Sequence, residues 1–203
     1  MRHLLIALLA CLLVPVVHAQ GGDPLLRQVL GELSSHPAVR AEFTQTRTSP
    51  ALDKPQISTG KLLFVLGHGM LWQTSAPFQQ TLVLTGARTA RIDADGRTQP
   101  MPGDRGVSQV SQMLQGLLGG KLDEALRQFD VAASGSPADW TLHFTPKQAR
   151  VARVLAAITL AGNDYLQAIT IDMQDGTRTQ IRFAATHDAG PLAALERDAL
   201  GQP

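Results

Sequence analysis

The feature that most constrains this chain is an alternation of apolar and polar residues, repeated in many short segments. In 39–48, for example, Val39, Ala41 and Phe43 alternate with polar residues. Successive side chains of a β-strand point to opposite faces of a sheet, so a period of two predicts strands with one buried face. Segments with this character are 39–48, 57–66, 70–74, 78–85, 90–93, 130–133, 140–145, 157–160, 166–173 and 177–185. They predict one mainly antiparallel sheet of about eight to eleven strands.

Two segments change to apolar spacings of three and four residues, the period of an amphipathic helix. The first, 23–34, begins with Asp23 and Pro24, a pair that favours a helix N-terminus. The second is 106–118. Weaker helical patterns occur at 122–129, 148–155 and 191–200. We therefore expect a mainly β, α+β fold in which two or three helices pack on one face of a strongly curved sheet.

The N-terminal segment has the features of a secretory signal. Arg2 and His3 precede the apolar stretch 4–17, and Ala19 supplies a small residue at the cleavage edge. This stretch is too short to span a bilayer, which takes about 20 residues. A lipoprotein box ending at Cys11 is less favoured, because the apolar run continues beyond the cysteine. We expect residues 1–19 to be removed on export to the periplasm and 20–203 to form one domain.

The charge balance of the expected mature chain argues against polyanionic partners. Of the 18 lysines and arginines, Arg2 falls in the signal segment, so 17 remain to balance the 17 acidic residues. Nucleic acids and anionic lipid surfaces are bound by clustered positive charge, which a neutral chain does not offer. The only cysteine, Cys11, also lies in the signal segment, so the mature chain can form no disulfide.

No residue pattern indicates catalysis, a metal site or a cofactor. The histidines of the mature chain stand singly, without the spacings typical of zinc ligands, and we interpret each as a linker, turn or surface residue. They are His36, His68, His143 and His187. Neither a nucleophile elbow nor a phosphate-binding loop is present, and the paired aspartates lie at predicted turns. The pattern favours a binding protein over an enzyme.

The apolar faces of the predicted strands have two interpretations. They could form an ordinary core, or they could line a cavity that holds an apolar guest under a helical lid. The candidate cavity residues are Leu62, Phe64, Leu66, Met70, Trp72, Leu82, Leu84, Ile181 and Phe183. The candidate lid residues, all within 106–118, are Val110, Met113, Leu114 and Leu117. Periodicity alone does not choose between a filled and an open interior.

An ordered set of short motifs resembles a known family. The motifs are VRAEFTQ at 39–45, STGKL at 58–62, Trp72 followed by Pro77, WTL at 140–142, TPK at 145–147, and TQIRF at 179–183. In this order they resemble periplasmic lipoprotein carriers of the LolA type. The resemblance implies an unclosed antiparallel β-barrel with a helical lid and a cavity that shields acyl chains. It also implies cargo received from an ATP-driven inner-membrane complex and delivered to an outer-membrane receptor.

One position departs from the family pattern. Typical members carry an arginine followed by proline where this chain has Leu66 and Gly67. In the family, that arginine bonds lid groups and holds the empty carrier shut. Because Leu66 has no donor in its side chain, we expect closure of the lid to rest mainly on apolar contact.

Three functions follow as hypotheses. The first is a monomeric periplasmic carrier that shields the acyl chains of a lipoprotein or lipid during transfer from the inner to the outer membrane. A divergent member of the family could instead serve a lipid or pigment export system. The second is a sensor or scaffold that binds a protein partner through a sheet edge or helix face. The third, an enzyme, lacks any clustered nucleophile, base or metal ligand.

Overall fold

The structure, a computed structural model, describes residues 23–85, 88–92, 97–100, 113–119 and 121–201. Its strands are β1 (Ala38–Thr48), β2 (Gln56–Val65), β3 (Gly69–Ala76), β4 (Gln80–Thr85), β5 (Arg88–Ile92), β6 (Thr98–Pro100), β7 (Phe129–Ser136), β8 (Asp139–Pro146), β9 (Leu155–Gly162), β10 (Leu166–Met173) and β11 (Arg178–Asp188). Its helices are α1 (Pro24–Ser34), α3 (Leu122–Gln128), α4 (Ala149–Ala152) and α5 (Ala194–Leu200), and residues 113–118 are also helical.

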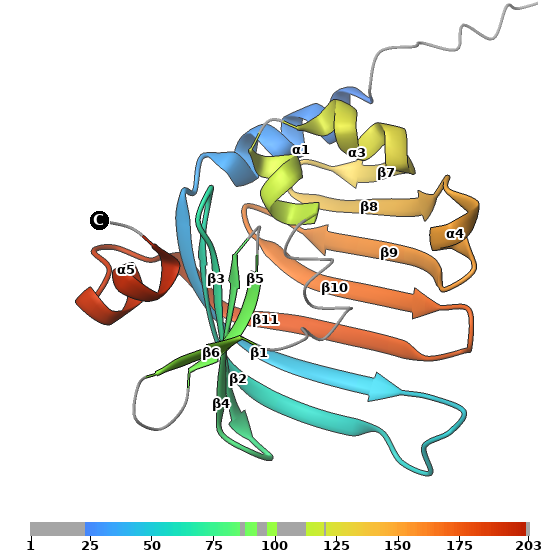
Figure 1. Cartoon of the computed structure of the whole chain (residues 1–203). Helices are drawn as coiled ribbons and strands as arrows, with labels where there is room; N and C mark the ends of the chain where they lie inside the picture. The colour runs from blue at the N-terminus through green and yellow to red at the C-terminus, as the bar shows by residue number, and fades with distance from the viewer. Residues whose placement is uncertain (1–22, 86–87, 93–96, 101–112, 120, 202–203) are drawn as a thin grey trace, which may run out of the picture.

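All of these strands belong to one antiparallel sheet. Its order is β6-β5-β4-β3-β2-β1-β11-β10-β9-β8-β7. The first strand, β1, lies at the centre because it pairs with both β2 and the last strand, β11. The sheet bends strongly, and its two edge strands, β6 and β7, do not pair with each other (Figure 1). This confirms the predicted mainly antiparallel, unclosed sheet.

Each predicted segment corresponds to an observed strand, with bounds that differ by at most three residues; the largest differences are at the ends of β7 and β11, which extend three residues beyond the predicted 130–133 and 177–185. The predicted strand 78–85 begins only at Gln80, and Phe78 lies before it with 81% of its surface exposed. The strand β6 has no counterpart among the predicted segments, since its three residues are too few to display a period.

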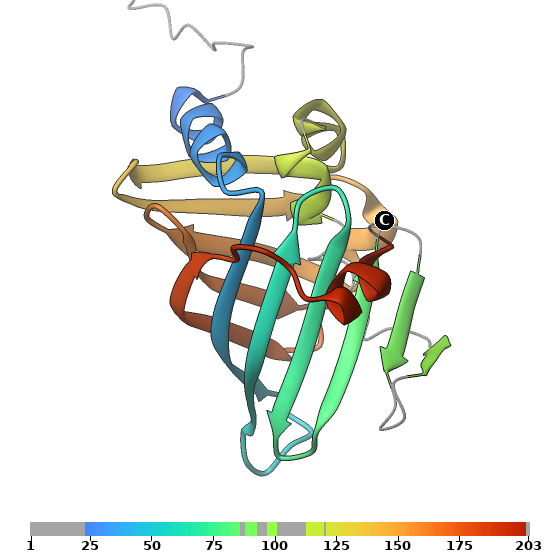
Figure 2. The same cartoon turned by 90° about the vertical axis from the view of Figure 1, so that its left-hand side faces the viewer.

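The helices cover both faces of the sheet, which corrects the expectation of a single covered face. The helix α1 and the 113–118 helix lie over the concave side, whereas α5 lies against the outer side of β3 and β4 (Figures 1 and 2). The reason is visible in β2, where the three consecutive residues Leu63, Phe64 and Val65 are all buried. Neighbouring residues of a strand point to opposite faces, so both faces of the sheet are covered here. Leu63 and Val65 face outward and pack with Leu200 of α5, so the outer face needs a cover of its own.

The predicted start of α1 is confirmed. The Asp23 carboxylate accepts a hydrogen bond from the Leu25 N–H at 2.9 Å, and Pro24 occupies the first helical position. The buried face of the helix is apolar and meets the concave side of the sheet. It consists of Leu26, Val29, Leu30 and Leu33.

The segment that joins β6 to β7 must connect opposite edges of the sheet, and it carries the 113–118 helix and α3. Crossing from edge to edge brings these helices to the open end of the curved sheet (Figure 1). Of the predicted helix 106–118, the part before 113 lies outside the described residues, as does the predicted signal segment 1–19. Within the described ranges, no helix has the length and apolar character needed to cross a membrane.

Candidate functional site

An apolar cavity lies on the concave side of the sheet, between β1, β2, β3, β10, β11 and the covering helices. Its lining consists of Leu33, His36, Val39, Ala41, Leu62, Phe64, Met70, Trp72, Leu114, Leu118, Tyr165, Leu166, Ile169, Ile181, Phe183 and Thr186. The cavity volume is about 70 Å³. That space admits only a few water-sized molecules, so the structure shows a state in which helices and side chains fill most of the hollow.

Six of the nine sequence-predicted cavity residues line this cavity. They are Leu62, Phe64, Met70, Trp72, Ile181 and Phe183. The other three, Leu66, Leu82 and Leu84, do not line it and instead pack within the surrounding core. Leu82 and Leu84 belong to β4, one strand farther along the sheet than the cavity wall at β3. Leu66 follows the end of β2, where its N–H donates to the Pro37 carbonyl at 2.8 Å.

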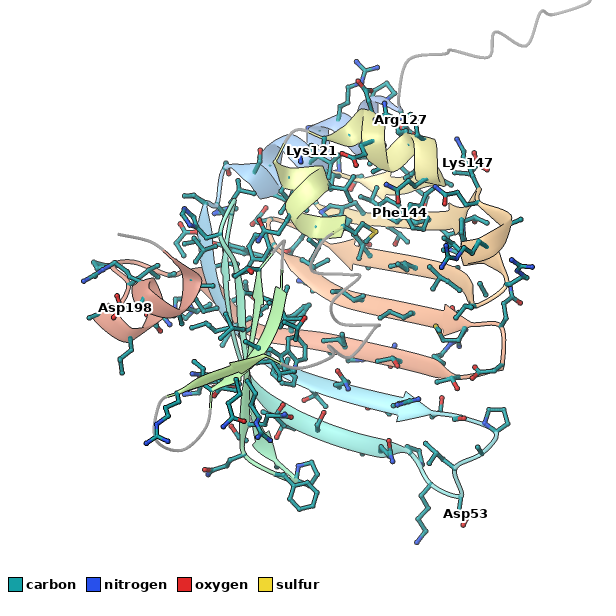
Figure 3. The ribbon with its side chains drawn as sticks, in the orientation of Figure 1. Asp53, Lys121, Arg127, Phe144, Lys147 and Asp198 are labelled. Carbon is teal, nitrogen blue, oxygen red and sulfur yellow. The ribbon has the colours of Figure 1, made fainter. Side chains whose placement is uncertain are left out.

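The predicted lid residues are divided between two cavities. Leu114 lines the apolar cavity and is buried. Met113 and Leu117 line a second cavity of about 660 Å³, which also contacts α3 and the sheet near β9. The wall of this second cavity is more polar and includes Lys121, labelled in Figure 3. The fourth lid residue, Val110, lies outside the described residues.

The cavity residue Trp72 stacks on Phe43, which belongs to the buried core. The Phe43 and Trp72 rings lie with their centroids 3.8 Å apart at an interplanar angle of 26°. Gly60 makes this packing possible, because a Cβ there would lie 2.8 Å from the Phe43 ring and would also collide with the Gln73 carbonyl. Close approach of the Gln73 carbonyl and the Phe43 ring therefore explains why a glycine occupies this position of the STGKL motif.

The 113–118 helix is held to the sheet by hydrogen bonds as well as by apolar contact. The Gln115 amide donates from Nε2 to the Val65 carbonyl at 3.0 Å and accepts from the Gly67 N–H at 2.8 Å. Closure therefore does not rest on apolar contact alone, although Leu114 and Leu117 of the same helix are buried in the core. The polar group comes from the helix and bonds the backbone of the β2–β3 turn, so no long side chain is needed at Leu66.

Three polar side chains meet at one end of the apolar cavity. His36 Nδ1 lies 2.7 Å from Asp188 Oδ1, and the Tyr165 hydroxyl donates to the same oxygen at 3.4 Å. The His36 and Tyr165 rings pack with centroids 4.4 Å apart. Sequence reasoning, which treats His36 as a linker residue, misses this cluster. No local signal could reveal it, because 152 positions separate His36 from Asp188.

The ionisation of Tyr165 reflects this environment. Burial, and then the negative charge of Asp188, raise the pKa of Tyr165 above its ordinary value. Since an unperturbed tyrosine already titrates near pH 10, the hydroxyl stays protonated and remains a donor at neutral pH. In the part of the chain that the structure describes, no three His, Asp or Glu residues gather as a metal site.

Comparison with known proteins gives one sequence match and several distant structural ones. The family model described as "Outer membrane lipoprotein carrier protein LolA" matches residues 34–195. A comparison with curated proteins finds no match. The LolA superfamily protein NE2245 from Nitrosomonas europaea aligns with 84% of this chain and 96% of its own, at 8% identity and a TM-score of 0.48. A chain of the Pseudomonas aeruginosa MucA/MucB complex aligns over 86% of this chain and 60% of its own, at 11% identity and a TM-score of 0.48.

Proposed function

This chain belongs to the LolA family of outer membrane lipoprotein carrier proteins, and from that premise we propose that it is a periplasmic carrier of acylated cargo. The cargo, a lipoprotein or a lipid, would place its acyl chains against the concave face of the sheet. The protein would take this cargo from an inner-membrane complex and give it to an outer-membrane receptor, acting as a monomer without a cofactor.

The observation that carries this proposal is the apolar cavity under the helices. Its wall combines residues of five strands with Leu33, Leu114 and Leu118 of the covering helical layer. An apolar wall stabilises an acyl chain by about 0.8 kcal/mol for each buried CH₂ group. A carrier needs this kind of shielding, and binding of this kind requires no catalytic group.

The small volume of the cavity implies that binding includes a movement. A long acyl chain does not fit into about 70 Å³, so the helical layer must move away from the sheet before the chain enters. Part of the binding energy is spent on this opening. The 113–118 helix is the candidate for the movement, since it lies on the segment that crosses between the edges of the sheet.

The two tryptophans of the chain allow a direct test. Trp72 lines the cavity, whereas Trp140 is buried elsewhere in the core, with its Nε1–H bonded to the Asn163 carbonyl at 2.6 Å. Two variants, Trp140→Phe and Trp72→Phe, each keep one of them. We expect a brominated fatty alcohol to quench Trp72 strongly and Trp140 weakly, because quenching by bromine requires close approach.

A solvent extract of the purified protein, analysed by mass spectrometry, shows whether acylated molecules are retained from the cell. Absence of lipid in the extract together with no quenching of either tryptophan would reject the carrier function. Equal quenching of both tryptophans would place the ligand outside the apolar cavity.

A second candidate function is the binding of a protein partner at a sheet edge. In the described sheet, β6 and β7 each pair with one neighbour only, which leaves backbone groups able to accept a further strand. Cross-linking in cells separates the candidates: a dominant protein partner with no extractable lipid favours this one.

A further inference from the structure

A β-bulge in β11 decides which of the last side chains of this strand reach the cavity. Ile181 and Phe183 line the cavity, so a regular strand would next turn residues 185 and 187 inward. The pairing with β1 shifts between Arg40 and Glu42, and Ala185, with φ of 51°, lies at the extra position.

The bulge reverses the alternation beyond it. Thr186 lines the cavity, and the Asp188 carboxylate contacts His36, which is also a lining residue. His187 instead lines a separate pocket together with Glu196 of α5, on the outer side of the sheet. A non-glycine residue with positive φ is strained, and such strain is often found at functional sites. The bulge is what aims the Asp188 carboxylate at His36.

The contact with Asp188 sets the proton position on His36. A carboxylate oxygen only accepts hydrogen bonds, so Nδ1 at 2.7 Å must carry the proton. In the neutral ring, Nε2 then has a lone pair and acts as an acceptor. Nε2 is buried, and within the described residues it has no hydrogen-bond partner. A buried acceptor without a partner gains free energy when a ligand supplies a donor.

The charges around the cluster are negative. Asp188 and Asp164 both act on Tyr165, Asp164 from the β9–β10 turn. The nearest arginine along β1, Arg40, is engaged by Glu196 on the outer side of the sheet. An anionic head group would therefore be repelled at this end of the cavity, whereas a neutral donor would not.

We propose that His36 Nε2 binds the polar head of an amphiphile whose chain occupies the cavity, and that this head is a neutral donor, an alcohol or an acyl amide. The inference rests on the proposed function, because it requires an acyl chain in the apolar cavity. It goes beyond that function by naming the head-group chemistry that the carrier selects.

The test compares four ligands with one chain length: dodecanol, dodecanamide, methyl dodecanoate and dodecanoate. Each displaces the neutral dye Nile red from the protein at about pH 8. For the wild-type protein we expect the alcohol and the amide to bind about three- to tenfold more tightly than the methyl ester, which accepts hydrogen bonds but cannot donate one to Nε2. Dodecanoate should bind more weakly than the alcohol.

Two variants test the role of the cluster. His36→Phe keeps a ring against Tyr165 but removes both nitrogens, so it should bind the methyl ester at least as well as wild type and lose the preference for the alcohol. Asp188→Asn no longer fixes the proton on Nδ1 of His36, because an amide can also donate to that nitrogen. The ratio of the affinities for the alcohol and the methyl ester should therefore fall toward one. Asp53→Asn, the same change in the exposed β1–β2 loop (Figure 3), is the control and should keep the preference.

Equal affinities for the alcohol, the amide and the ester, or a preference that survives in His36→Phe, would overturn the head-group proposal. The carrier function would stand in either case, since the dodecyl chain would still displace the dye. If none of the four ligands displaces the dye, both proposals are rejected.

Discussion

At the scale of single residues, Gly60 has no room for a side chain, because a Cβ there would lie 1.9 Å from the Gln73 carbonyl oxygen and 2.8 Å from the Phe43 ring. The ring lies over the glycine and stacks on Trp72, and both aromatic residues are buried. Aromatic pairs of this kind stabilise a core by about 0.5–1.5 kcal/mol beyond their buried area. A side chain at Gly60 would separate the ring from the strand below it.

We predict that Gly60→Ala lowers the free energy of unfolding by about 1–3 kcal/mol, since the new methyl group overpacks the site. Gly31→Ala is the matched control. Gly31 lies in α1, where an added Cβ would meet no other atom within 4 Å, so the alanine should stabilise the protein by about 0.5–1 kcal/mol. Urea denaturation of both variants measures these changes. A Gly60→Ala protein as stable as wild type would contradict the steric requirement, since both the Gln73 carbonyl and the Phe43 ring would then have to shift at no cost.

At the scale of elements, the structure holds two helices against the sheet by different means. The 113–118 helix is bonded through Gln115 to the β2–β3 turn. The helix α5 is bonded through Glu196 to Arg40 of β1 in a two-point ion pair, with N–O distances of 2.7 and 2.8 Å. The first connection closes the cavity, and the second fastens the outer face.

We predict that Gln115→Met opens the 113–118 helix without unfolding the sheet. Methionine has a similar length but cannot make the two hydrogen bonds, each of which contributes about 1 kcal/mol. Amide hydrogen exchange in 113–118 should therefore accelerate by roughly ten- to thirtyfold, with exchange in β1 and β2 unchanged. Unaltered exchange in the helix would show that apolar contact alone holds it closed.

The Arg40–Glu196 pair predicts a pH dependence of stability. Its hydrogen bonds with Arg40 lower the pKa of Glu196 below its ordinary value. A carboxyl group whose pKa is depressed by folding contributes stability above its unfolded pKa of about 4.3 and loses it as the pH falls through the folded pKa. Glu196→Gln should therefore lower the free energy of unfolding by about 1 kcal/mol at neutral pH, and by progressively less below about pH 4.

Thermal or urea unfolding at several pH values measures this dependence. Asp198→Asn, on the same helix (Figure 3), removes a charge from an exposed position and is the control. A cost for Glu196→Gln that does not change between neutral and acidic pH would mean that the pair contributes through packing rather than charge.

At the scale of the whole molecule, the curved sheet and the helices enclose a hollow that side chains largely fill. The sheet is unclosed, so its curvature can change without breaking a ring of strands. The helical cover lies at the open end, as Figure 1 shows. The proposed carrier function requires a capacity larger than the space of about 70 Å³ observed here.

We predict that affinity rises with the length of the acyl chain until the vacated hollow is full. For alcohols from decanol to hexadecanol, each added methylene should strengthen binding by up to about 0.8 kcal/mol, or roughly fourfold. Competition with Nile red gives the dissociation constants. A plateau at some length measures the capacity of the open state, and affinity independent of length would indicate binding outside the apolar cavity.

Local sequence patterns determine the elements of this protein. The alternation along 39–48 and the pair Asp23-Pro24 predict β1 and the start of α1, because periodicity and helix capping depend on neighbouring residues alone. The order of short motifs also indicates the family, and strand faces predict cavity residues such as Phe64 and Trp72. These inferences need no knowledge of how distant segments meet.

Only the tertiary structure decides what depends on distant segments. The outer face under α5, the bond from Gln115 to the β2–β3 turn, and the contact of His36 with Asp188 all join parts of the chain that are far apart in sequence. The bulge at Ala185 reverses the side-chain alternation that the sequence predicts for the end of β11. The physical reason is that side-chain periodicity specifies which residues share a face, whereas curvature, register and bulges determine which faces meet.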